Sequence, residues 1–193
     1  GMVDDFSLYS RSSRLKPAML SLNELARDVL VLYESVMVVL DIQLADNLPM
    51  ISADPALLRQ VIHNLIQNAL DACASAVAPR ITIATKLVGE RVCLRVEDNG
   101  SGIRDDVKTR IFEPYVTTKP KGTGLGLAIV KKIIDEHRGT IIVTNVKPTG
   151  ARVEIELQQQ FVALSEEVAN SAGGRRIESS TSTKLGSISD VIK

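Results

Sequence analysis

The chain has little cysteine, no net charge and no long apolar run, and each of these excludes a class of function. Its two cysteines, Cys73 and Cys93, lack the CxxC or Cys/His spacing of a metal site, so we expect buried free thiols rather than a disulfide or ligands. Basic and acidic residues both number 23, which argues against a nucleic-acid or anionic-membrane partner. The longest apolar stretch, 29–40, contains Glu34 and is too short to span a bilayer.

Three segments of different composition divide the chain. Residues 1–15 are typical of the last turns of a helix, and Gly1 before Met2 is typical of a tag remnant, so we expect a piece of a longer protein. Residues 16–158 carry the regular apolar patterns and predict one domain. Residues 159–193 are rich in serine, threonine, glycine and charges with little periodicity, which predicts a flexible tail or linker.

Helical and strand patterns are mixed along the chain without βαβ repetition. Ser21 to Glu24 fits a capping box that opens a helix to about residue 40, and Asp54-Pro55 opens a second helix to about residue 76. A third helix is expected over 127–137. The predicted strands are 41–48, 81–87, 91–97, 140–145 and 152–157. This mixture predicts an α+β fold, a sheet with helices on one face.

The most informative segment is 119–127, where three glycines at alternate positions stand directly before an amphipathic helix. Glycine lets backbone N–H groups approach a ligand, and the first turn of a helix presents free N–H donors with partial positive charge. Gly122, Gly124 and Gly126 therefore predict a phosphate-binding turn, although such turns also serve ordinary helix capping. Five of the twelve glycines fall within 100–126, which favours one ligand-covering loop.

Two further motifs carry polar side chains that suit a nucleotide. On the second helix, Asn64 and Asn68 lie about 40° apart at one edge of the apolar face. Their amide oxygens could bind a hard cation such as Mg²⁺, or the two amides could simply face water. At a strand end, Asp98 could accept the N6 amine of adenine while Gly100 and Gly102 let the backbone approach the ring; a plain turn is the alternative.

The segment before the glycines carries Phe112, Tyr115 and Lys119. The two aromatic side chains could hold a mobile loop against the domain, and the lysine could reach phosphate oxygens. Ordinary aromatic packing and a solvated lysine are the alternatives.

Taken together, the order and spacing of these motifs resemble the N, G1, F and G2 boxes of the GHKL ATPase superfamily, in its histidine-kinase branch. The resemblance covers about residues 20–157. Residues 2–11, together with Phe112 to Lys119, are most similar to nitrogen-regulation sensor kinases of the NtrY type. It implies the Bergerat ATP-binding fold, a two-layer α/β sandwich with a mixed, mostly antiparallel sheet. It also implies that 16–158 is the catalytic ATP-binding domain and 1–15 the end of a dimerisation hairpin.

The resemblance implies that the domain binds ATP and Mg²⁺ and transfers the γ-phosphoryl group to a histidine on the dimerisation hairpin, for relay to a response regulator. By this likeness Asn68 is the Mg²⁺ ligand, Asn64 lies near the phosphates and Asp98 takes the adenine amine. Asn64, Asn68 and Lys119 are the expected catalytic residues. The expected nucleotide-binding set is Asn64, Asn68, Asp98, Gly100, Gly102, Ile103, Tyr115, Thr118, Lys119, Gly122, Thr123, Gly124, Leu125, Gly126 and Leu127.

The likeness also implies a homodimer and a response regulator receiver domain as partners. The domain is expected in the cytoplasm, within a protein anchored in the inner membrane by segments absent from this chain. Ala151 stands where relatives carry a threonine near the adenine, which predicts slightly weaker nucleotide binding. Many relatives carry Lys or Arg three residues after the Mg²⁺ asparagine, whereas this chain has Asp71, so we do not carry a phosphate contact over to that position.

Three functions are weighed from these residues. Asn64 stands where ATP-hydrolysing relatives such as gyrase and MutL carry glutamate, so attack by water should be slow and an ATPase clamp is disfavoured. A degenerate nucleotide-binding module without phosphotransfer is kept open by Asp71 and Ala151. Neither His63, about 140° from Asn68 on the helix, nor a helix-ending His137 is the expected phosphoacceptor. The active kinase domain is the leading hypothesis, and this piece alone should not autophosphorylate.

Overall fold

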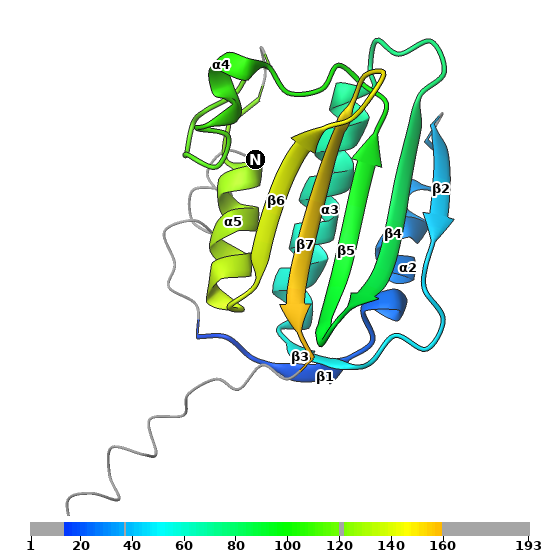
Figure 1. Ribbon diagram of the computed structural model, residues 1–193, viewed down its shortest axis with the longest axis vertical. Helices are drawn as coiled ribbons and strands as arrows, with labels where there is room; N and C mark the ends of the chain where they lie inside the picture. Colours follow the sequence, from blue (N-terminus) through cyan, green and yellow to red (C-terminus); the bar gives the residue numbers. More distant parts are fainter. Residues whose placement is uncertain (1–13, 37, 120–121, 160–193) are drawn as a thin grey trace, which may run out of the picture. The chain divides into compact units, whose positions relative to one another are not determined.

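Figure 1 shows the computed structural model of the chain, which describes residues 14–36, 38–119 and 122–159. One layer of this described part is a five-stranded sheet in the order β2-β4-β5-β7-β6. Its strands are β2 (Val39–Gln43), β4 (Arg80–Val88), β5 (Arg91–Asp98), β6 (Thr140–Asn145) and β7 (Ala151–Gln158). β2 pairs parallel with β4, and the other neighbours pair antiparallel, so the predicted mixed, mostly antiparallel sheet is confirmed.

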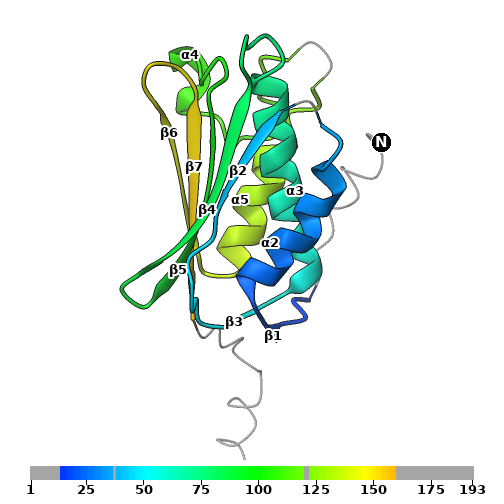
Figure 2. The same cartoon turned by 90° about the vertical axis from the view of Figure 1, so that its right-hand side faces the viewer.

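Helices form the second layer. Figure 2 shows α2 (Leu22–Leu30), α3 (Pro55–Ala72) and α5 (Gly126–Glu136) on the same face of the sheet, which confirms the predicted α+β sandwich. A 3₁₀ turn, Val31–Tyr33, follows α2, and the short helix α4 (Asp105–Lys108) lies in the long loop after β5. A separate antiparallel pair joins β1 (Ala18–Leu20) to β3 (Ile51–Ala53).

Both predicted helix N-caps are present. The Ser21 Oγ accepts the Glu24 N–H at 3.3 Å. The Asp54 Oδ1 accepts the N–H groups of Ala56 and Leu57 at 3.0 and 3.2 Å. Because these side chains satisfy N–H groups that have no partner within the helix, α2 and α3 begin where the sequence predicts.

The first helix is shorter than predicted. Its α-helical part ends at Leu30, and β2 begins at Val39, inside the stretch that we expected to remain helical. The β-branched valines at 36, 38 and 39 favour extended backbone, and pairing with β4 stabilises the strand. That strand also ends at Gln43 instead of running to residue 48. The strands β1 and β3 were not predicted, since three residues each carry too little alternation.

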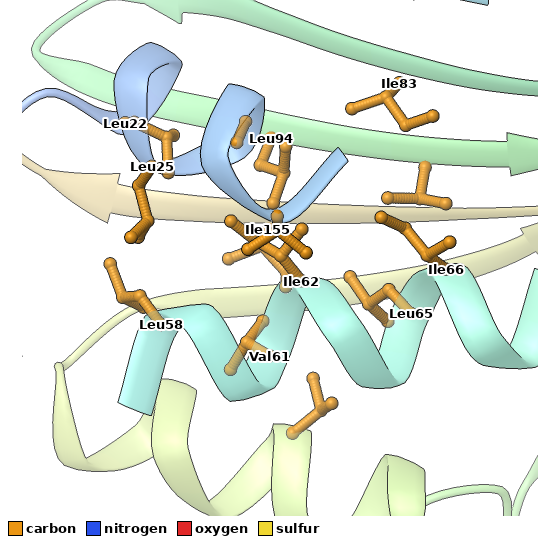
Figure 3. Packing of buried hydrophobic residues seen from close by; sticks show 14 of the residues in the cluster. Leu22, Leu25, Leu58, Val61, Ile62, Leu65, Ile66, Ile83, Leu94 and Ile155 are labelled. Carbon is orange, nitrogen blue, oxygen red and sulfur yellow. The ribbon is translucent and has the colours of Figure 1, made fainter. Parts of the chain in front are cut away.

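The hydrophobic core lies between the sheet and the helices, and α3 contributes half of the residues labelled in Figure 3. Ile62 and Ile66 are 1% and 0% exposed. The helix packs against both α2 and α5 as well as against β4 and β5. Full burial of each such side chain contributes roughly 1.5 to 3 kcal/mol. The apolar face of α3 is therefore fixed, and so is the polar edge that carries Asn64 and Asn68.

Both cysteines and both histidines have structural surroundings. Cys73 and Cys93 are buried free thiols, as predicted, and burial raises the pKa of each. The Nδ1 atom of His63 lies 2.6 Å from the hydroxyl of Tyr33, in the 3₁₀ turn that follows α2.

His137 has a structural role that links two helices. Its ring is 2% exposed. The Nε2 atom accepts the Asp54 N–H at 3.0 Å, and Nδ1 lies 2.7 Å from the carbonyl oxygen of Ile133, to which it donates. The ring therefore joins the end of α5 to the N-cap of α3.

The predictions for the two ends of the chain fall mainly outside the described residues. These are the hairpin end, of which only residues 14 and 15 are described, and the tail after residue 159. Within the described ranges, no helix is long and apolar enough to cross a membrane.

Candidate functional site

The asparagine edge of α3 faces the first turn of α5. The Asn64 Nδ2 donates to the carbonyl oxygen of Gly126 across 3.5 Å, between residues that are 62 positions apart. The amide nitrogen of Asn68 lies 3.6 Å from the point where a Cβ on Gly126 would stand. Both asparagines are partly buried. The structure therefore brings the two asparagines to the last glycine of the expected phosphate-binding turn.

Lys119 reaches the same edge of α3. Its ammonium nitrogen donates to the Asn68 Oδ1 at 3.0 Å and to the Asp71 Oδ2 at 2.7 Å. The side chains of Lys119 and Asp71 are 37% and 41% exposed, so this ion pair lies at the surface. We call Asn68, Asp71 and Lys119 the Lys119 cluster. The Asn68 and Asp71 oxygens together hold this ammonium group, and Asn68 is the residue expected to bind Mg²⁺.

Asp98 is a buried acid at the end of β5, with 8% of its surface exposed. Its Oδ1 accepts the N–H groups of Gly100 and Ala151 at 2.9 and 3.3 Å. Burial raises the pKa of this carboxyl, while the two N–H groups and the charge of Lys119 act in the opposite direction. No residue in the described ranges donates a hydrogen bond to Oδ2. One oxygen therefore stays available to a donor on a ligand.

Two glycines beside Asp98 are required by close approaches of the backbone. A Cβ on Gly150, whose φ is +123°, would overlap the carbonyl oxygen of Asp98. A Cβ on Gly100 would overlap the carbonyl oxygen of Ala72, at the end of α3. Together with Gly102 we call Asp98, Gly100 and Gly150 the Asp98 cluster. Because Ala72 directly follows Asp71, the Asp98 cluster and the Lys119 cluster meet at the same end of α3.

Asn145 holds the segment that follows Gly102. Its Oδ1 accepts the Ile103 N–H at 2.8 Å, and its Nδ2 donates to the Ile103 carbonyl oxygen, also at 2.8 Å. Asn145 is not among the residues that the sequence predicted for the site. No local pattern marks it, since the two residues are 42 positions apart.

A backbone hydrogen bond joins Tyr115 to Gly124, close to the start of α5. The Tyr115 N–H donates to the Gly124 carbonyl oxygen at 3.0 Å, and both residues have positive φ, +66° and +69°. The ring of Tyr115 is 64% exposed, so it does not pin the loop to the domain as expected. The Gly122 N–H donates to the Lys119 carbonyl oxygen at 3.2 Å, which keeps the lysine and the first glycine adjacent.

The remaining predicted residues differ in what they can offer a ligand. The Leu125 side chain is 2% exposed within the core, so only its backbone faces the turn, and the Thr123 Oγ1 accepts its N–H at 3.4 Å. Leu127 is half-buried and packs against the core, whereas Thr118 is exposed. The side chains that could contact a ligand here are therefore mainly those of α3, Lys119 and Asp98.

A metal ion in this site would take few ligands from the protein. Among residues 14–36, 38–119 and 122–159, no three His, Cys, Asp or Glu side chains form a metal-binding group. Mg²⁺ is commonly held by one or two protein oxygens together with substrate phosphates and water. The oxygens of the Lys119 cluster suit that kind of coordination.

A hollow of about 480 Å³ lies elsewhere, between the end of α2 and β2. None of the predicted site residues lines it. Its lining residues are Arg27, Leu30, Val31, Tyr33, Glu34, Val36, Val38, Leu40 and Ile42.

A one-sided sandwich with a buried acid at a strand end and a glycine turn at a helix start defines a nucleotide-binding domain of the GHKL class. Residues 53–160 match the family described as histidine kinase-, DNA gyrase B- and HSP90-like ATPases. The chain belongs to this ATP-binding family.

Sensor kinases are among its relatives. The chain is 37% identical over 164 residues to the nitrogen regulation protein NtrY of Azorhizobium caulinodans, covering 81% of this chain and 21% of that protein. It is 44% identical over 112 residues to the sensor histidine kinase ZraS of Escherichia coli O157:H7, covering 58% of this chain and 24% of that protein. The chain therefore spans less than a quarter of the length of these curated relatives.

Solved structures of histidine kinases share the fold. The nucleotide-free catalytic domain of ThkA is 33% identical with a TM-score of 0.68, covering 75% of this chain and 97% of that one. Full-length ShkA in complex with AMPPNP is 28% identical with a TM-score of 0.70, covering 81% and 35%. ThkA in complex with the response regulator TrrA is 31% identical with a TM-score of 0.70, covering 82% and 46%. Within the ATP-binding family, the chain belongs to the histidine kinase catalytic domains.

Proposed function

We propose that this domain binds Mg-ATP beside the end of α3 and transfers the γ-phosphoryl group to a histidine on a dimerisation hairpin of the full-length protein. The main support is that Asn68, the first turn of α5 and the Asp98 cluster all lie at the C-terminal end of α3. The ShkA complex with AMPPNP supports a nucleotide as the ligand.

Each part of the site suits one part of Mg-ATP. The free Oδ2 of Asp98 would accept the N6 amine of adenine, with Gly100, Gly102 and Ile103 beside the ring. The backbone from residue 122 to 127 would hold phosphate oxygens at the start of α5. The Asn68 Oδ1 already holds a cation, the ammonium of Lys119, so it fits a magnesium ion. Bound Mg²⁺ neutralises charge on the phosphates.

The amide at position 64 favours transfer to histidine over hydrolysis. Asn64 donates to the carbonyl oxygen of Gly126, and an amide cannot take the proton of an attacking water. A neutral imidazole is already a nucleophile and needs no such base. The domain then has to position the nucleotide and neutralise its charge.

The phosphoacceptor would come from outside the described residues. His63 and His137 contact Tyr33 and Asp54, as structural side chains do. We therefore expect no autophosphorylation by this chain alone, a homodimer through the hairpin in the full-length protein, and a receiver domain as the next acceptor. The ThkA complex with TrrA supports such a partner. We expect this domain in the cytoplasm, with other segments of the protein anchoring it to the inner membrane.

Calorimetric titration of Mg-ATP and Mg-ADP tests the binding step. We expect the wild type to bind both nucleotides with a requirement for Mg²⁺, Asn68→Ala to lose that requirement with much of the affinity, and Asp98→Asn to bind very weakly. Glu90→Gln, an exposed acid in the β4–β5 turn, is the matched control and should bind like the wild type. A folded wild-type domain that binds neither nucleotide would contradict the proposal.

A separate dimerisation hairpin with ATP labelled in the γ-phosphoryl group tests the transfer step. Label should appear on the hairpin histidine and should be absent when the hairpin is omitted. Binding without transfer would favour a regulatory nucleotide-binding module, an alternative that Asp71 in place of a basic residue supports. Rapid ATP turnover without the hairpin would instead favour an ATPase clamp.

A further inference from the structure

The ammonium of Lys119 occupies a place beside Asn68 that suits a metal ion. Lys119 is 51 positions from Asn68 and 48 from Asp71, yet it donates to both, at 3.0 and 2.7 Å. Amide and carboxylate oxygens are the ligands that Mg²⁺ prefers. The Asn68 and Asp71 oxygens therefore suit a divalent cation, and in this structure the Lys119 ammonium lies between them.

We propose that the side-chain oxygens of Asn68 and Asp71 form a cation site, which the Lys119 ammonium occupies in the absence of ligand. Mg²⁺ that enters with a nucleotide then takes the place of this ammonium. This inference rests on the proposed nucleotide-binding function. It adds Asp71 to the metal-binding residues, directly or through a bound water, and it gives Lys119 two positions.

Electrostatics requires the exchange if the metal binds at Asn68. Two cations on one amide oxygen would stand within a few ångströms of each other and repel strongly. The incoming ion displaces the ammonium, and Asp71 then faces the metal as an uncompensated carboxylate. A carboxylate beside an amide oxygen attracts a divalent ion more strongly than an amide alone.

The displaced lysine would have a use in the same site. Its long side chain is only partly buried, so it can turn without breaking core contacts. Lys119 lies directly before the expected phosphate-binding turn, to which the Gly122 N–H connects it. The positive charge that this chain lacks at position 71 would then reach the phosphates from position 119.

Binding of Mn²⁺ alone, followed by electron paramagnetic resonance, tests the occupied site without any nucleotide. Lys119→Met keeps a long side chain but removes the charge, and it should bind Mn²⁺ at least about tenfold more tightly than the wild type. The double variant Lys119→Met, Asp71→Asn should lose this gain. Lys131→Met is the matched control, because Lys131 pairs with Asp135 within α5 and should leave Mn²⁺ binding unchanged.

Equal Mn²⁺ affinity in the wild type and Lys119→Met would overturn the proposal, as would a gain that survives Asp71→Asn. Circular dichroism verifies that each variant is folded. Mg-ADP titration of the wild type separates the two possible failures. Binding of Mg-ADP without the Mn²⁺ gain would reject the exchange alone, whereas absent Mg-ADP binding would reject the nucleotide-binding function.

Discussion

The Asp98 cluster and the Lys119 cluster meet at one end of α3, but backbone contacts hold the first and exposed side chains form the second. Asp98 is buried, its Oδ1 is held by two backbone N–H groups, and Gly100 and Gly150 bring backbone into direct contact. The Lys119 cluster consists of side chains, and its ion pair joins groups that are more than a third exposed.

This difference in construction determines what each cluster can do. A buried hydrogen-bonded group is costly to disturb, since each partner left alone loses its solvation without compensation. An exposed ion pair is worth little and can be exchanged at small cost. We therefore expect the Asp98 cluster to keep one geometry with and without ligand, and the Lys119 cluster to change with its cation.

The largest expected effect comes from filling the backbone contact of the Asp98 cluster. Gly150→Ala places a Cβ against the Asp98 carbonyl oxygen at a φ of +123°, and should lower the free energy of unfolding by at least about 3 kcal/mol. Gly89→Ala is the matched control, since Gly89 also has positive φ, +59°, but nothing lies within 4 Å of its Cβ position. It should cost about 1 kcal/mol. Urea unfolding measures the free energy of unfolding of both variants. Equal losses would show that the backbone around Gly150 shifts to make room for the Cβ.

The next effect separates binding from stability at Asp98. An asparagine can keep its oxygen toward the Gly100 and Ala151 N–H groups, but then presents an NH₂ group where the ligand needs an acceptor. Asp98→Asn should therefore weaken Mg-ATP binding about 100-fold, or about 2.7 kcal/mol, without lowering the urea midpoint. An equal loss of stability and affinity would mean that the carboxylate is structural.

The third effect is a change in the free energy of unfolding with pH that arises from Asp98. Burial raises the pKa of Asp98 above its usual 3.8, so between these two values the folded state binds more protons than the unfolded state. The contribution of this group to the free energy of unfolding is complete below pH 3.8 and is lost as the pH rises through the folded-state pKa. Urea unfolding from about pH 4 to 7 should show the wild type falling relative to Asp98→Asn. If the stabilities of the wild type and Asp98→Asn change with pH in the same way, Asp98 does not have the raised pKa.

The smallest effect belongs to the exposed cluster. Lys119→Met removes a surface ion pair and should change the free energy of unfolding by less than about 1 kcal/mol. Lys131→Met, which removes the exposed pair with Asp135, should change it by a similar amount. A large loss in Lys119→Met alone would mean that the lysine holds the loop rigidly, which would remove the contrast between the clusters.

The candidate site was predictable where its chemistry follows from local spacing. Asn64 and Asn68 share an edge because the helix repeats every 3.6 residues, and the glycines mark the turn before α5 because few other residues fit there. The likeness to a known ATPase family then supplied expected roles. Asn145 and the cation-holding role of Asp71 were missed, since their partners Ile103 and Lys119 lie 42 and 48 positions away.

Local patterns in the sequence determined the helix starts after Ser21 and Asp54, the strands on either side of Gly89 and the family of the domain. They do so because caps and turns depend on neighbours within a few residues. Only the tertiary structure decided that a parallel strand begins at Val39, where the sequence predicted helix. It also decided that His137 accepts a hydrogen bond from the Asp54 N–H, 83 positions away, and that Lys119 donates to Asn68. Those contacts depend on how the packed core places distant backbone segments, and no local pattern records that placement.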